Sequence, residues 1–278
     1  MNIFNFEFKR LFKGNIIWAL VCSVLIVMFM LFFPSMKEMG MQELVGSKLE
    51  SLPEAFLEAF NISGATDFSN ISDFSAYVLQ YIVMAGGIYA AILGVSSLAK
   101  EESEGTIEFL YSKPVTRSRI VTAKILANAF ILFIFIIIVF IITIISTIIV
   151  KPDDVKFVSV IIDINKIYLG MALISYVFMT IGFLISIFVK SAKKATSIAL
   201  GIFFASYILG IFSKLQDRLS GFIYLSPFDY AAPSNVIKNG FEEKYIIIGL
   251  GIMIISLAGT YIISVSYTHL TLPTTERV

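Results

Sequence analysis

The sequence predicts an all-α membrane protein with six transmembrane helices, and two observations lead to this fold class. First, 58% of the 278 residues are hydrophobic and only 15% are charged, whereas about 25% of the residues of a soluble domain are charged. Second, the hydrophobic residues gather in several uncharged runs of roughly 18 residues or more, the length that an α-helix needs to cross a bilayer. One soluble core needs no such runs, so we expect the chain to lie in a lipid bilayer.

The expected spans follow the apolar runs in order. Pro34 directly follows the first run and should close it, because proline in a helix interior removes a backbone hydrogen bond. The third run is longer than a bilayer requires, so its helix should tilt or protrude. The expected spans are residues 15–33, 74–98, 120–150, 167–189, 196–212 and 245–265. Residues 1–265 should therefore form one polytopic transmembrane domain.

The basic residues of the loops indicate how the chain lies in the membrane. With a cytoplasmic N-terminus, the inside segments hold about eleven Lys and Arg residues in roughly 45 positions, and the outside segments hold about nine in nearly twice that length. Lys151, Lys156 and Lys166 lie in a short outside loop and count against this orientation. The excess predicts that both termini are cytoplasmic. The composition, rich in Ile, Phe, Lys and Asn, is typical of an AT-rich bacterial genome and so points to a bacterial cell membrane.

The residues before the first span have the pattern of an amphipathic helix. The apolar residues recur at helical spacing on one face, and charged residues occupy the rest of the surface. We expect an interfacial helix on the inner leaflet, with its basic face near anionic lipid; a solvated extension of the first span is the alternative. The residues assigned to this interfacial helix are Phe4, Phe8, Lys9, Arg10, Leu11 and Phe12.

Two long outside loops contain apolar residues. Residues 34–73 include an amphipathic segment at 47–60, which we expect to pack on the spans rather than to lie on the membrane surface. Residues 213–243 include an aromatic segment, 221–233, that two prolines interrupt. Such a segment fits either the aromatic belt at the membrane interface or a short re-entrant helix buried against protein.

The inside loop of residues 100–119 is the segment that suggests a function. It begins with an acidic patch, continues through a glycine into a short apolar helical face, and ends at a proline, which disfavours helix at the residue before it. A short helix with charged flanks between two spans could be moved by a cytoplasmic partner; an ordinary charged loop is the alternative. Its distinctive residues are Glu101, Glu102, Glu104, Gly105, Thr106, Pro114, Arg117 and Arg119.

This loop is similar to the pattern that follows the second span in the permease subunits of type-2 ABC exporters. In those permeases an acidic residue precedes Gly-Thr, and a hydrophobic stretch, a proline and an arginine then lead into the third span. The matching positions here are Glu104, Gly105, Thr106, Pro114 and Arg117. The resemblance extends from Met1 to about Val265 and includes the amphipathic start, the long first outside loop and a Ser-Pro-Phe loop before the last span.

The resemblance implies a mechanism and a set of partners. Two such subunits, identical or not, would pair in the membrane as an exporter, and two separate ABC ATPase subunits would dock beneath them. The eight distinctive residues of the 100–119 loop would then form a coupling helix that contacts the ATPase. The chain has no Gly-x-x-x-x-Gly-Lys-Ser/Thr phosphate-binding loop. We therefore expect no catalytic activity and no cofactor in this chain, with ATP used by the partner subunit.

Other classes of membrane protein were weighed against this interpretation. Carriers driven by ion gradients usually have ionisable residues inside their spans, and we took the span interiors of this chain to be uncharged. A secondary carrier of a neutral solute and a non-transporting scaffold or sensor remain alternatives. A metal-dependent membrane enzyme is disfavoured, because the chain has only His269 and Cys22 as histidine and cysteine ligands. The net charge of +1 gives no reason to expect a nucleic-acid partner.

The last residues differ in character from the rest of the chain. The segment 266–278 has Arg277 as its one basic residue, whereas a cytoplasmic end after a final span usually carries several. The segment resembles the translation of sequencing-adapter DNA. We therefore expect it to be a non-native tail and exclude it from the fold.

Overall fold

The computed structural model describes residues 3–38, 53, 56–57, 67–103, 116–153, 155–189 and 191–266. Within these residues the regular structure is entirely helical, and six helices are long and apolar enough to cross a membrane. These are α1 (Ile3–Glu38), α4 (Ile71–Ser103), α6 (Arg117–Val150), α7 (Phe157–Ser186), α8 (Ala192–Leu215) and α10 (Glu243–Ser266). The predicted fold class, an all-α protein with six spans, is confirmed.

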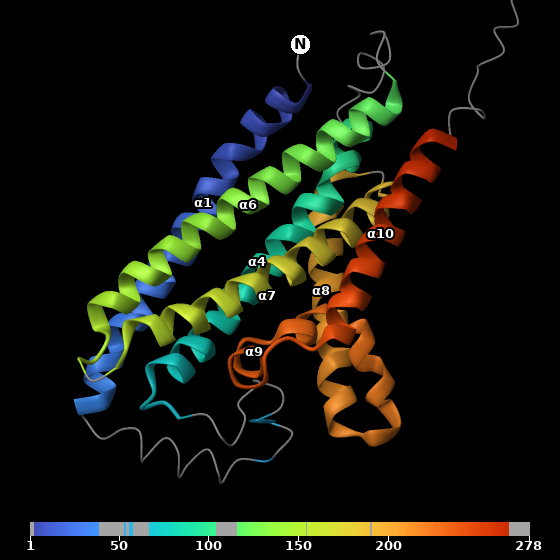
Figure 1. Ribbon diagram of the computed structural model, residues 1–278. Helices are drawn as coiled ribbons and strands as arrows, with labels where there is room; N and C mark the ends of the chain where they lie inside the picture. The colour runs from blue at the N-terminus through green and yellow to red at the C-terminus, as the bar shows by residue number, and fades with distance from the viewer. Residues whose placement is uncertain are drawn as a thin grey trace, which may run out of the picture.

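The six long helices form one bundle in which successive helices run in opposite directions (Figure 1). Helices α1 and α6 begin, and α4 and α10 finish, at the same side of the bundle, which is at the top of Figure 1. We call this side the near end. At the opposite, far end lie three short helices between α8 and α10. These are η1 (Asp217–Leu225), η2 (Pro227–Ala231) and α9 (Pro233–Asn239).

Helix α4 is the centre of the bundle. It packs most extensively against α7 and also contacts α1, α6, α8 and α9. In its most apolar stretch 72% of the residues are buried, against 17% in the corresponding stretch of α10. The outer helices leave large aliphatic side chains exposed, such as Ile254 and Ile255 of α10. Exposed aliphatic surface of this kind suits contact with lipid hydrocarbon.

Two helix boundaries differ from the sequence prediction. Pro34 was expected to close the first span, but α1 continues through it to Glu38. A proline removes one hydrogen bond of the preceding turn, and this loss is tolerated where only one more turn of helix follows. Helix α7 begins at Phe157 rather than at residue 167, so Lys166 lies within a helix, 3.6 Å from Asp163. Hydropathy predicted the apolar part of these helices but not the helical turns beyond it, which contain polar residues.

The amphipathic start was expected to be an interfacial helix on the inner leaflet, with an extension of the first span as the alternative. In the structure it forms the first turns of α1, which runs without a break from Ile3 to Glu38 (Figure 1). The rings of Phe4 and Phe8 lie 6.4 and 5.9 Å from the ring of Phe130 in α6. The apolar face therefore packs against another helix of the bundle. Phe12 and Lys9 are exposed, whereas Leu11 is partly buried.

The aromatic segment 221–233 before the last span is divided between η1, η2 and the start of α9. All five residues of η2 are buried, while η1 has no buried residue. The ring of Tyr230 stacks on that of Tyr245 at 5.6 Å, and its hydroxyl donates to the carbonyl oxygen of Tyr224. Burial raises the pKa of Tyr230 to about 12.

Candidate functional site

The two flanks of the predicted coupling helix lie at the near end of the bundle. Helix α4 ends at Ser103 and α6 begins at Arg117, with Arg117 partly buried and Arg119 exposed in the first turn of α6. Glu101 and Glu102 belong to the last turn of α4; their side chains are outside the described part. Glu104, Gly105, Thr106 and Pro114 lie outside the described residues altogether, as do residues 267–278 of the expected tail.

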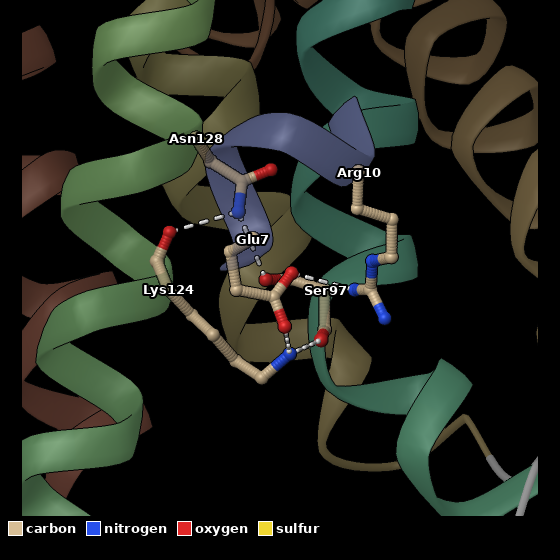
Figure 2. Close-up of polar contacts among 5 residues, drawn as sticks. All are labelled: Glu7, Arg10, Ser97, Lys124 and Asn128. Atoms are coloured by element: carbon tan, nitrogen blue, oxygen red, sulfur yellow. Dashed lines mark hydrogen bonds and ion pairs between the residues drawn. The ribbon is translucent and has the colours of Figure 1, made fainter. Parts of the chain in front are cut away.

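A cluster of buried polar side chains joins α1, α4 and α6 just below these flanks (Figure 2). It brings together an acid and a base from α1, a serine from α4, and a lysine and an amide from α6. We call it the charge cluster, and its members are Glu7, Arg10, Ser97, Lys124 and Asn128.

Lys124 is the centre of the charge cluster. Its side chain is 0% exposed and its Nζ donates to Glu7 Oε1 at 2.8 Å and to the carbonyl oxygen of Ser97 at 3.0 Å. The Glu7 side chain is only 3% exposed. One ammonium group thus connects α6 to both α1 and α4.

Arg10 completes the ion pairing from within α1. Its guanidinium lies 2.7 Å from Glu7 Oε2, one turn along the helix. Both oxygens of Glu7 are therefore paired with cations, one from its own helix and Lys124 from α6. Two cations face one anion, so the charge cluster carries an excess positive charge in a largely buried place.

Asn128 of α6 joins the charge cluster to α4 through Ser97. Its Nδ2 donates to Ser97 Oγ at 3.2 Å and to the carbonyl oxygen of Lys124 at 2.8 Å. Asn128 Oδ1 and Arg10 Nε are buried without a hydrogen-bond partner in the described part of the protein. Both residues line a cavity of about 60 Å³, whose other walls are Leu11, Ile92, Leu93, Ser96 and Ser97.

Helix periodicity explains how the residues of the charge cluster come to face one another. Glu7 and Arg10 are three residues apart and Lys124 and Asn128 are four apart, so each pair shares one face of its helix. The long aliphatic stem of a lysine lets its ammonium group reach a polar partner from within an apolar segment. A charged group in such a place is costly. The pairing with Glu7 offsets part of that cost.

A second ion pair fastens the short helices to the far end of α8. Lys214 Nζ lies 2.8 Å from Asp229 Oδ1, and Ser226 Oγ donates to Asp229 Oδ2 at 2.6 Å. A side chain at Gly210 would collide with Asp229 and Ser226, so the glycine lets η2 lie directly against α8. This pair resembles the charge cluster in chemistry but lies at the opposite end of the bundle.

The far end also has an open pocket of about 500 Å³ between α4, α7 and α9. Asp67, Asp73 and Asp163 contribute to its lining, and Lys238 lies 3.7 Å from the carboxylate of Asp73. Among the described residues, no group of three or more His, Cys, Asp or Glu side chains is arranged to hold a metal ion. The pocket is polar and open to solvent.

Comparison with known families decides the class of the protein. A family model described as ABC-2 family transporter protein matches residues 1–269. The chain belongs to the ABC-2 transporter family. Comparison with individual curated proteins gave no significant match. Family membership and the six long apolar helices make this ABC-2 protein a multi-pass membrane protein with the role of a permease, the membrane subunit of a transporter.

The charge cluster of this ABC-2 protein was not expected from its sequence. The span interiors were taken to be uncharged and Lys124 was counted with the basic residues of the inside loop, which is wrong because the side chain is fully buried inside α6. Arg10, which the sequence assigned to the basic face of an interfacial helix, pairs with Glu7. One signal was available: Glu7 is the only acidic residue before Glu38. A lone acid in a basic, aromatic segment indicates a specific cationic partner.

Proposed function

We propose that this chain is the membrane-spanning permease subunit of an ABC exporter and that separate ATPase subunits drive it through the 100–119 loop. The match to the ABC-2 family over residues 1–269 carries the proposal. Proteins of this family in general work with ABC ATPases. The chain would hold no cofactor of its own, because ATP is bound and hydrolysed in the partner.

The arrangement of the helices supports the 100–119 loop as the point of coupling. Its flanks are the last turn of α4 and the first turn of α6, two helices of 33 and 34 residues. A helix is stiff over this length, so a push on the loop moves whole spans. Because α4 contacts α1, α6, α7 and α8, its movement would reach most of the bundle.

The proposal includes an orientation and a second permease. The near end would face the cytoplasm of the cell, with both termini and the 100–119 loop on the side where ATP is found. A second copy or a paralogue would pair with this subunit to enclose the translocation path. Export rather than import follows the family resemblance. The large apolar surface of the spans suits an amphipathic or lipid-like substrate.

The proposal is tested by purifying the protein in mild detergent from its native host. We expect an ABC ATPase, recognised by its phosphate-binding loop, to co-purify with the wild-type chain. Glu104→Ala and Gly105→Leu should weaken that association or uncouple ATP hydrolysis from transport, with membrane insertion unchanged. The matched control is Asp217→Ala, which removes an exposed acid from η1 at the far end and should leave the complex intact.

Two results would overturn the proposal. An intact, folded protein that captures no ATPase would favour a carrier of a neutral solute or a scaffold. If the Glu104 and Gly105 variants bind the ATPase and transport as well as the Asp217 variant does, the loop does not couple the two subunits.

A further inference from the structure

The charge cluster lies close to both flanks of the 100–119 loop. Ser97 comes six residues before the end of α4 at Ser103, and Lys124 comes seven residues after the start of α6 at Arg117. At 1.5 Å per helical residue, the cluster is roughly 10 Å from these two helix ends along each helix. The hydrogen bonds of Lys124 join these two flanks to each other and to Glu7 of α1.

Stability alone does not explain a buried pair of this kind. Replacing a buried ion pair by well-packed apolar residues is often neutral or stabilising, because desolvation of the charges offsets their attraction. In a helix that crosses a membrane, a buried ionisable residue indicates a functional role. Lys124 has no exposed surface, so the group it serves lies within the protein.

We propose that the charge cluster is a positioning element, in which the Lys124–Glu7 pair carries movement of the 100–119 loop into α1. This inference rests on the proposed function. A shift of α4 and α6 displaces the Ser97 carbonyl and the Lys124 ammonium together, and the charge on Glu7 makes α1 follow. Without the pair, the first turns of α1 would keep the packing of Phe4 and Phe8 against α6 and would lose their charged link to Lys124.

Two buried polar atoms of the charge cluster could pair with each other in a second conformation of this element. Arg10 Nε is a donor and Asn128 Oδ1 is an acceptor, and neither has a hydrogen-bond partner among the residues that the structure describes. Their residues come from α1 and α6 (Figure 2), and both residues line the cavity of about 60 Å³. Movement of α1 that closes the cavity would bring this donor and acceptor together. Coupling between sites requires an element with two discrete arrangements, and the cluster has the groups to form both.

The test separates positioning from stability through the substitution Lys124→Met. Met matches the length of the lysine stem, and Glu7 keeps its pairing with Arg10, so no buried charge loses all its partners. The variant should therefore melt at the wild-type temperature or above it. The matched control is Lys214→Met, which breaks a lysine–carboxylate pair of the same length at the far end.

The readout is the distance between spin labels at Lys9→Cys and Lys194→Cys, two exposed near-end positions, in a Cys22→Ala background. The permease is held in lipid nanodiscs with its ATPase, with and without a non-hydrolysable ATP analogue. The analogue should shift the distance in the wild type. In Lys124→Met the ratio of shifted to unshifted molecules should fall by about tenfold, within the usual range of coupling between sites. Glu7→Gln, which removes the partner charge, should show the same loss.

Each outcome decides the inference. A Lys124→Met protein that responds to the nucleotide as the wild type does would overturn it, as would an equal loss in the Lys214→Met control. In both cases the wild-type response would still support the proposed function. A wild-type protein that binds no ATPase would instead overturn the proposed function, and this inference with it.

Discussion

Gly94 of α4 and Gly182 of α7 lie backbone against backbone at the centre of the bundle. A Cβ atom on Gly182 would lie 2.9 Å from the carbonyl oxygen of Ala91 and 3.0 Å from the Cα of Gly94. A Cβ atom on Gly94 would collide with the carbonyl oxygen of Met179. Real Cβ atoms do not come so close to backbone, so the two helices can pack in this way only with glycine at both positions. Small residues that let helices approach closely are typical of membrane proteins.

We expect Gly94→Ala to destabilise the protein, because the neighbouring backbone cannot move aside as a flexible side chain would. Overpacking of a core typically costs about 1–3 kcal/mol. Thermal unfolding in detergent, followed by size-exclusion fluorescence, measures the loss. Gly251→Ala in α10 is the matched control, because an added Cβ would meet nothing within 4 Å there. That variant should be neutral or gain up to about 1 kcal/mol from helix propensity. Equal melting temperatures for the two variants would contradict the packing argument.

Deletion of residues 266–278 should leave insertion, melting temperature and ATPase association unchanged. The expected non-native character of this segment is the reason, since a tail that never evolved with the spans supplies none of their contacts. Membrane fractionation and thermal unfolding check the prediction. A truncated chain that fails to insert would show that the segment is part of the fold.

The apolar part of each span could be predicted from the sequence because a run of uncharged residues is a local signal. The charge cluster could not, because Glu7 and Lys124 are 117 residues apart and hydropathy treats a lysine near the end of a span as part of the loop. The predicted boundaries of α1 and α7 were wrong for a related reason. Near Pro34 and Phe157 the chain is still helical but no longer purely apolar. The contact of Gly94 with Gly182 is likewise a property of two distant segments.

Alkaline pH should destabilise the far end through Tyr230. Burial raises the pKa of this phenol in the folded protein from 10.0 to about 12. The folded state therefore keeps a proton that the unfolded state releases above about pH 10. The contribution of Tyr230 to stability should be constant well below pH 10 and should fall as the pH rises from 10 towards 12. Tyr230→Phe has no such proton, so its unfolding free energy should fall less steeply over this window. Equal slopes for the two proteins, measured by thermal unfolding between pH 9 and 12, would contradict the assignment to Tyr230.

Asn15 and Tyr89 form a buried hydrogen bond between α1 and α4 that should behave as a unit. Tyr89 Oη donates to Asn15 Oδ1 at 2.9 Å, while Asn15 Nδ2 is buried without a partner in the described part. Tyr89→Phe would leave the Asn15 amide with both of its polar atoms unpaired, at a cost of about 1–3 kcal/mol.

The double variant Asn15→Leu/Tyr89→Phe tests this interpretation, because it removes both partners at once. Replacing both groups by apolar ones can be nearly neutral, so the double variant should be more stable than Tyr89→Phe alone. A double-mutant cycle of melting temperatures measures the difference. If the two substitutions simply add, the hydrogen bond contributes little, and packing of the Tyr89 ring against Trp18 at 5.3 Å holds α1 to α4 instead.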